Sequence, residues 1–326
     1  MWTTTCAVSS LTNAVLPIFR ASTVPNVTLA HDFGTTSLRH MQMTWHHSKL
    51  SGGTAAASQN TSTGPTVVFH HATALGPRCY APFLSELGDS YHLKALAMRP
   101  LWQDAPPPNP RREWDLFADD MIEWIEATQN APVLAMGHSI GAATTAMAAV
   151  KRPDLFKGLV LIEPSGVTRR IRLLLKLLPY RLRQTKGPAA EVLSGPTQWP
   201  DLASAFVYYR ASKAYRRFDD ATLHGLIEAL TVPDDTGIKL EYPRNWEAHL
   251  YATPPLILPT LKRLTVPTEV IIGKPSLFMD PSIARNLRDS RPDMTFQSLP
   301  DYGHLLPLEA PTQVADAART ALDRLR

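Results

Sequence analysis

The chain has 326 residues, of which 44% are hydrophobic and 19% charged, and its formal net charge is +4 at pH 7. This composition is ordinary for a soluble enzyme and excludes a chain that is disordered throughout. The basic residues are spread along the sequence, which argues against a nucleic-acid partner. Cys6 and Cys79 belong to no Cys/His cluster at metal-ligand spacing, so the sequence predicts neither a zinc site nor a disulfide framework.

The N-terminal segment differs in composition from the rest of the chain. Residues 1–31 are rich in Ser and Thr and hold a single Arg and no Asp or Glu. Transit peptides share this composition, whereas a flexible or locally packed arm over residues 1–25 is the simpler interpretation. No apolar run reaches the ~18 residues of a membrane helix. We therefore expect a soluble, cytoplasmic protein, with import into an organelle as the alternative.

Strands and helices are predicted to alternate along the chain. Strands are predicted at residues 36–47, 66–71, 92–99, 131–137, 159–164, 267–273 and 294–300. Helices are predicted at residues 79–89, 114–129, 140–150, 282–290 and 311–325, and residues 51–65 are expected to form a polar loop. This alternation indicates a mostly parallel sheet with helices on both faces.

The alternation is interrupted between Ser165 and Leu264. Apolar residues recur there at helical spacing, in residues 169–182, 201–217 and 219–230. We interpret this insertion as a helical cap over one edge of the sheet. The predicted organisation is an arm at 1–25, a first core segment at 26–164, the cap at 165–264 and a second core segment at 265–326.

The motif Gly-His-Ser-Ile-Gly, residues 137–141, stands where a predicted strand runs into a helix. In this context G-x-S-x-G is typical of a sharp turn that exposes a strained serine at the carboxyl ends of the strands, although a plain turn could carry the same letters. Ser139 is therefore the candidate nucleophile. The free N–H of Ile140, at the start of the helix, would favour negative charge on a nearby oxygen.

A serine nucleophile needs a base, and His304 is the best placed histidine because it follows the last predicted strand. The turn "FHHATALG" offers a second oxyanion donor, for which we favour Thr73, with Ala72 beside it. His71 and His138 are candidate substrate contacts. The ring of His71 could instead brace the turn, and the side chain of His138 should point away from the nucleophile.

The stretches "FHHATALG", "GHSIGAATT", "LVLIEP" and "DYGHLLPLEAP" occur in an order and spacing that resemble the α/β-hydrolase superfamily, in particular its capped serine hydrolases. The resemblance begins at about residue 26. It implies an eight-stranded sheet, a helical cap after the sixth strand and a triad of nucleophile, acid and histidine. Haloalkane dehalogenases and epoxide hydrolases of this superfamily carry an aspartate at the elbow, so Ser139 argues against both activities.

The sequence departs from the superfamily pattern in two places. The loop after the fourth strand reads "MRPLWQDAPPP", so Pro100 and Trp102 should shape that rim differently. Ser276 stands where the acid commonly follows the seventh strand, and Asp280 comes four residues later. Some members place the acid after the sixth strand, where this chain has Glu163. We prefer Glu163 as the acid, with Asp280 as the alternative, and Glu163 could otherwise form a salt bridge to the cap.

The first helix of the cap combines basic and apolar residues. It carries seven basic residues and no acidic one between Val167 and Lys186, together with an apolar stripe of Ile171, Leu174, Leu175 and Leu178. The stripe either packs on the core while the basic residues face water, or the helix makes a weak contact with anionic lipid or an acidic substrate tail. Further along the cap, Trp246 is a candidate substrate-binding residue.

Together these features predict a serine hydrolase that cleaves a small or medium apolar carboxylic ester through an acyl-enzyme, with no cofactor and no metal ion. A small-molecule substrate is the expected partner, and the oligomeric state stays open. One alternative is hydrolysis of a carbon–carbon bond in a diketone-like substrate, which the same apparatus can perform. The other is a receptor that keeps the fold and binds a ligand without turnover.

Overall fold

The computed structural model describes residues 43–129, 132–276, 279 and 281–326. The predicted N-terminal arm at 1–25 and the alternative acid Asp280 lie outside these residues. An eight-stranded sheet has the strand order β1-β2-β4-β3-β5-β6-β10-β11. Its strands are β1 (Thr44–Leu50), β2 (Gly53–Gln59), β3 (Thr66–His70), β4 (His92–Leu96), β5 (Val133–His138), β6 (Phe156–Ile162), β10 (Thr268–Lys274) and β11 (Thr295–Pro300). Pairing is antiparallel from β1 to β2 and from β2 to β4, and parallel across the rest, which confirms the predicted mostly parallel sheet.

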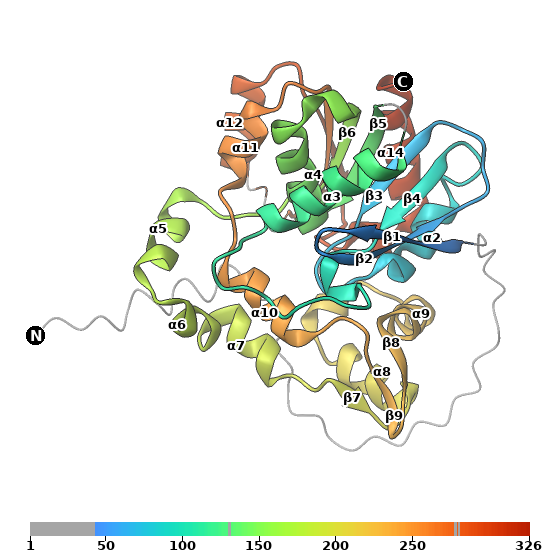
Figure 1. Ribbon diagram of the computed structural model, residues 1–326, viewed down its shortest axis with the longest axis vertical. Helices are drawn as coiled ribbons and strands as arrows, with labels where there is room; N and C mark the ends of the chain where they lie inside the picture. The colour runs from blue at the N-terminus through green and yellow to red at the C-terminus, as the bar shows by residue number, and fades with distance from the viewer. Residues whose placement is uncertain (1–42, 130–131, 277–278, 280) are drawn as a thin grey trace, which may run out of the picture.

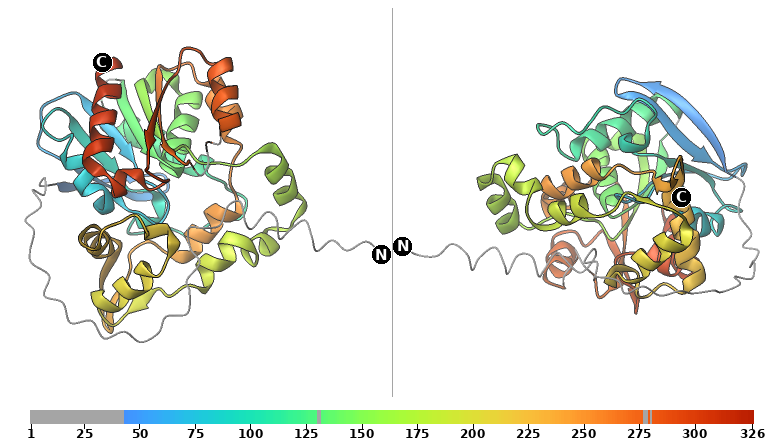
Figure 2. Two further views of the ribbon diagram at one scale, coloured as in Figure 1. Left: turned by 180° about the vertical axis from the view of Figure 1, so that it is seen from behind. Right: turned by 90° about the horizontal axis from the view of Figure 1, so that it is seen from below.

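Helices cover both faces of this sheet (Figure 1, Figure 2). One face carries α3 (Asp115–Thr128), α4 (Ile140–Lys151), α11 (Ile257–Arg263) and α12 (Pro281–Ser290), and the other carries α2 (Ala81–Ser85) and α14 (Pro311–Arg324), which α13 (Leu306–Glu309) precedes. In β5, Val133 and Ala135 join the first core cluster whereas Leu134 and Met136 join the second. Successive side chains of a strand point to opposite faces, so one continuous apolar run fills both cores.

The prediction that residues 51–65 form a loop is wrong, because β2 lies within this range. Its middle residues, Ala55, Ala56 and Ala57, are buried, and β2 pairs with β1 and β4 along its edges. The turn before β2 is held to α3, since the Glu123 carboxylate accepts hydrogen bonds from the N–H and the hydroxyl of Ser51, both at 2.6 Å. Glycine and alanine, which make up four of the seven residues of β2, are depleted in strands. The pairing with its two neighbours makes it a strand.

Most of the chain between β6 and β10 lies together at one end of the sheet, as Figure 1 shows. It comprises α5 (Arg169–Leu177), α6 (Tyr180–Gln184), α7 (Gly187–Ser194), α8 (Leu202–Arg210), α9 (Asp220–Leu230) and α10 (Arg244–Ala252). Helix α11 falls inside the predicted cap range of 165–264, yet it packs against α4 beside the sheet. The division into core and cap stays a prediction, and α11 belongs with the core on packing grounds.

The insertion also holds a small antiparallel sheet that we did not predict. Its order is β7-β9-β8, with β7 at Gln198–Trp199, β8 at Thr231–Asp234 and β9 at Gly237–Leu240. Asp234 pairs with Gly237, which leaves a two-residue turn between β8 and β9. Gly237 has φ +140°, and a Cβ there would lie 2.4 Å from the carbonyl oxygens of Trp199 and Pro200. The sequence "DDTG" therefore carried a hairpin signal within a region that otherwise has helical spacing.

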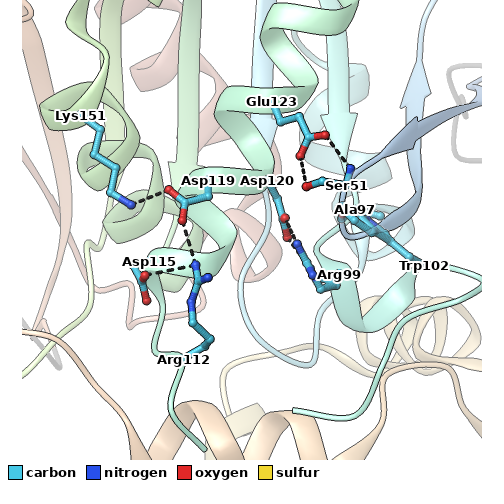
Figure 3. A network of polar contacts seen from close by, with 10 residues as sticks. All are labelled: Ser51, Ala97, Arg99, Trp102, Arg112, Asp115, Asp119, Asp120, Glu123 and Lys151. Atoms are coloured by element: carbon cyan, nitrogen blue, oxygen red, sulfur yellow. Dashed lines mark hydrogen bonds and ion pairs between the residues drawn. The ribbon is translucent and has the colours of Figure 1, made fainter. Parts of the chain in front are cut away.

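The unusual loop after β4 is closed against α3 (Figure 3). Trp102 is buried, and its indole N–H donates to the carbonyl of Ala97 at 2.7 Å. The Arg99 guanidinium lies over the Trp102 ring at 5.2 Å and forms a two-pronged ion pair with Asp120 of α3. Burial raises the pKa of Asp120, and the contact with Arg99 opposes that rise. This loop is therefore fixed against α3 by the Trp102 and Arg99 contacts.

Candidate active site

The GHSIG motif forms a strand-to-helix turn between β5 and α4. Ser139 has φ 57° and ψ −118° and is 6% exposed. Its N–H donates to the carbonyl of Ile162 at 2.9 Å, so the turn is anchored to β6. A Cβ on Gly141 would lie 2.0 Å from the carbonyl oxygen of His70. Only glycine lets α4 approach the end of β3 this closely, and the backbone strain at Ser139 is the strain expected of a nucleophile elbow.

Three side chains from separate segments meet at this turn. The Nε2 atom of His304, in the loop between β11 and α13, lies 2.9 Å from the Ser139 Oγ. Its Nδ1 lies 3.1 Å from the Oε2 of Glu163, the residue that follows β6. A serine hydroxyl, an imidazole and a carboxylate in line allow the serine proton to pass to the imidazole while the carboxylate holds the ring.

The Glu163 carboxylate is fully buried and held by further donors. Gly273 N–H donates to its Oε1 at 2.8 Å, and the Ser276 hydroxyl donates to its Oε2 at 2.9 Å. Glu163 has φ 48°, in the left-handed region that non-glycine residues seldom occupy. Ser276, at the position where a carboxylate commonly follows the seventh strand, here supports the carboxylate of the preceding strand. Glu163 contacts the His304 ring and stays the proposed acid, while the alternative, Asp280, lies outside the described residues.

The turn after β3 faces the same cavity as Ser139. The N–H of Ala72 donates to the Tyr80 hydroxyl at 3.1 Å and is therefore engaged. Thr73 and Ile140 both line the cavity beside Ser139 and His304. Ile140 is the first residue of α4, and the first N–H groups of a helix have no partner within it. Backbone N–H groups of Thr73 and Ile140 are therefore the candidates for holding an oxyanion.

The three predicted substrate contacts lie outside the cavity lining. His71, His138 and Trp246 are each at most 3% exposed. The Nε2 of His71 accepts the Met98 N–H at 2.8 Å, and its Nδ1 lies 2.8 Å from the Ala72 carbonyl. These bonds brace the turn, which was the alternative interpretation of His71. Trp246 packs its ring against that of Phe117 at 5.9 Å and belongs to the core. The prediction that these three residues contact the substrate is therefore wrong for this cavity, because none of them lines it. The sequence shows the type of a residue, whereas only the structure shows whether its side chain is buried away from a substrate.

His138 forms a buried link that the sequence did not suggest. Its Nδ1 lies 2.6 Å from the Tyr80 hydroxyl, and its Nε2 lies 2.8 Å from the main-chain oxygen of His304. Burial lowers the pKa of His138 well below its usual value, and His304 lowers it further. Burial likewise raises the pKa of Tyr80. A neutral His138 protonated on Nε2 therefore accepts from Tyr80 and donates to His304.

A cavity of about 480 Å³ opens beside Ser139 and His304. Most of its lining is apolar, from the turn after β3 and from the insertion, including Leu174, Leu175, Leu178, Leu182, Leu230, Leu240 and Leu250. A volume of this size lies within the range of ~300–1,000 Å³ that small-molecule sites occupy. The cavity and the contact between Ser139 and His304 therefore belong to one candidate site.

Part of the cavity wall is polar. Arg244 Nη1 donates to Glu247 Oε2 at 2.8 Å, and their side chains are 11% and 1% exposed. The Glu247 Oε1 atom is buried and has no hydrogen-bond partner among the described residues. Burial raises the pKa of Glu247, and Arg244 opposes this rise. Five tyrosines also line the cavity: Tyr208, Tyr209, Tyr215, Tyr242 and Tyr251.

Other reactive or metal-binding groups are scarce in the part of the chain that the structure describes. Within those residues, no cluster of His, Cys, Asp and Glu is arranged to hold a metal ion. Cys79 is a buried thiol, and burial raises its pKa to about 12. It therefore stays protonated and is a poor nucleophile. No described helix is both long enough and apolar enough to cross a bilayer.

Comparisons with known proteins agree with this architecture. Residues 67–317 match the model of a family described as the alpha/beta hydrolase family. The 2-(acetamidomethylene)succinate hydrolase of Mesorhizobium japonicum is 20% identical over 265 residues, which cover 80% of this chain and 89% of that protein. A crystal structure of E-2-(acetamidomethylene)succinate hydrolase has a TM-score of 0.73 and 18% identity, covering 86% of this chain and 100% of that chain. A thioesterase domain from the curacin biosynthetic pathway has a TM-score of 0.66 and 20% identity, covering 85% and 98%.

Proposed function

The chain belongs to the α/β-hydrolase family and is a hydrolase, and from this premise we propose that it cleaves a small or medium apolar carboxylic ester through an acyl-enzyme on Ser139. The observation that carries the proposal is the continuous contact from the Ser139 Oγ through the His304 ring to Glu163, at 2.9 Å and 3.1 Å. A hydroxyl in such contact with an imidazole becomes a nucleophile at neutral pH.

The reaction uses the site in two halves. In the first, His304 takes the Ser139 proton as Oγ attacks the ester carbonyl, and the N–H groups of Thr73 and Ile140 hold the oxyanion. The alcohol leaves with the proton from His304, and the acyl group stays on Ser139. In the second, His304 takes a proton from water, the hydroxide attacks the acyl-enzyme, and the acid departs as the proton returns to Ser139. Glu163 stabilises the imidazolium in both halves.

The cavity supports an apolar acyl group of limited length. Leucines of α5 and Leu250 of α10 line it, so an acyl chain would leave water as it binds. The polar wall offers a further feature, because the unpaired Oε1 of Glu247 can accept one hydrogen bond. Substrates whose far end carries a hydroxyl or an amide N–H would satisfy that atom.

The test is covalent labelling by a fluorophosphonate probe together with turnover of a short nitrophenyl ester. Ser139→Ala should abolish labelling and lower turnover by about 10⁶, as loss of the nucleophile does in a serine protease. Ser165→Ala is the matched control, because Ser165 is a second buried serine of the same cavity. Labelling that persists in Ser139→Ala, or that is lost in the control alone, would overturn the assignment. A folded wild-type protein with neither labelling nor turnover would favour the ligand-binding alternative.

A further inference from the structure

The helix α5 and the turn into α6 present leucines to solvent beside the mouth of the cavity. Leu173 is 62% and Leu177 is 73% exposed, and no residue of α5 is buried. The expected packing of its apolar stripe on the core is therefore not seen, since Leu174 and Leu178 are exposed as well. Figure 1 and both views of Figure 2 show α5 standing away from the body of the molecule.

Basic side chains surround these leucines. Arg169, Leu173 and Leu177 are four residues apart and so share one side of α5, with Lys176 alongside. Arg172 is already paired with Glu113 before α3, and this pair ties α5 to the body. Arg169 and Lys176 form no ion pair with an acid of the described residues. The solvent-facing side of α5 is therefore both apolar and cationic.

The same segment forms one wall of the catalytic cavity. Leu174, Leu177, Leu178 and Leu182 line the cavity although each is exposed. A residue that borders both a cavity and solvent lies at the opening between them. The cavity therefore opens to solvent along the leucines of α5 and α6.

From these three observations we propose that the solvent-facing side of α5 and the turn into α6 docks on an anionic lipid surface, with the cavity mouth at that surface. Exposed leucines flanked by Arg and Lys are the pattern of a helix that lies in the interface of a membrane. The charge complementarity selects an anionic lipid over a neutral one. The proposal rests on the proposed function in one respect: a lipophilic ester dissolved in the lipid would reach Ser139 without crossing water.

The test is co-sedimentation of the full chain with vesicles of phosphatidylcholine alone or mixed with phosphatidylglycerol. Binding should require the anionic lipid and weaken in 1 M salt, where the Debye length falls to about 3 Å. Arg169→Gln and Lys176→Gln should each weaken binding about fivefold, since one basic residue near an anionic surface is worth about 1 kcal/mol. Leu173→Gln should weaken it roughly tenfold. The matched control is Leu193→Gln, an exposed leucine of α7 that should bind as the wild type does.

Two further measurements keep docking separate from catalysis. Ser139→Ala should bind vesicles normally, so a failure of the proposed chemistry leaves this result intact. Leu173, Arg169 and Lys176 do not line the cavity, so their variants should hydrolyse a water-soluble ester at the wild-type rate. Absence of binding, or equal binding to both kinds of vesicle, would overturn the proposal. A different outcome is that the chain fails to bind vesicles and forms a concentration-dependent dimer that Leu173→Gln abolishes. This outcome would show that the solvent-facing side of α5 binds a second copy of the chain.

Discussion

The Nε2 atom of His138 lies 2.8 Å from the main-chain oxygen of His304. Through this bond the residue beside the elbow serine holds the backbone of the proposed base. The Tyr80 hydroxyl joins the other side of the His138 ring and also accepts the Ala72 N–H. One buried chain of hydrogen bonds thus connects the turn that offers the oxyanion donors, the elbow and the histidine loop.

We expect Tyr80 to be a positioning residue. Tyr80→Phe leaves the Ala72 N–H and the His138 Nδ1 buried without partners, and each such group costs roughly 1–3 kcal/mol. The loop of His304 should then shift, and kcat should fall about tenfold or more with little change in KM, because a misplacement of about 1 Å can cost catalysis about 100-fold.

The matched control for Tyr80→Phe is Tyr91→Phe. Tyr91 is equally buried, but its hydroxyl donates to Asp323 at 2.6 Å and is not part of the chain of hydrogen bonds that reaches His304. It should lower the melting temperature without lowering kcat. If Tyr80→Phe and the wild type have equal kcat values, the hydrogen bonds of Tyr80 have only a structural role.

The second prediction concerns the acid. Glu163→Gln should lower turnover by about 10⁴, because an amide holds the imidazole in the wrong tautomer. Asp280→Asn should change turnover little. Ser276→Ala, which removes one donor from the carboxylate, should have a smaller effect than Glu163→Gln. Steady-state kinetics on a nitrophenyl ester measure all three, and the reverse ranking of Glu163 and Asp280 would move the acid to the segment after β10.

The third prediction concerns the acyl group. Each buried methylene contributes about 0.8 kcal/mol of transfer free energy. If part of this gain is present in the transition state, kcat/KM should rise roughly two- to four-fold per methylene until the cavity is full. The measurement is kcat/KM across nitrophenyl esters from acetate to laurate. A series that is flat or falls from the shortest ester would show that the leucine-lined cavity does not hold the acyl chain.

The fourth prediction is a loss of stability in mild acid. Burial lowers the pKa of His71 to about 4 and also lowers the pKa values of His70 and His138. Between pH 6.5 and 4 the unfolded chain binds protons that the folded His71 does not. The stability present above pH 6.5 should therefore fall by up to about 1.4 kcal/mol per pH unit because of His71, and burial of His70 and His138 acts in the same direction.

Urea unfolding at pH 7, 6 and 5 measures this loss. His71→Gln should be less stable at pH 7 but should lose less stability on acidification. The matched control is His46→Gln, which removes an exposed imidazole of β1. A wild-type free energy of unfolding that is constant from pH 7 to pH 5 would contradict the prediction.

The fifth prediction concerns the buried ion pair in the cavity wall. Arg244→Met leaves the Glu247 carboxylate buried and unpaired, so the free energy of unfolding should fall by about 3–5 kcal/mol. Changing both residues to Met should cost less than Arg244→Met alone. Arg319→Met breaks an exposed pair with Asp316 and a hydrogen bond to the Glu86 carbonyl, and it should cost less than Arg244→Met. A double variant less stable than the single one would refute this account of the pair.

Local patterns in the sequence determined the alternation of strands and helices, the elbow around Ser139 and the place of His304 after the last strand. Each depends on residues close together in the chain, because apolar period and turn chemistry act over a few residues. The structure places the Ser139 Oγ within 2.9 Å of the His304 Nε2. The catalytic roles of both residues stay predictions.

Only the tertiary structure decided what depends on distant neighbours. The alanine run of β2 became a strand because two other strands pair with it, and Trp246 entered the core instead of the cavity. The link from Tyr80 to His304 joins residues far apart in sequence, and no local pattern predicts such a contact. From the sequence alone, the leucines of α5 could equally have packed on the core. They are exposed because the tertiary structure packs no other element over α5 among the described residues. Local sequence sets which elements form and which chemistry is available, whereas burial and contact are properties of the whole chain.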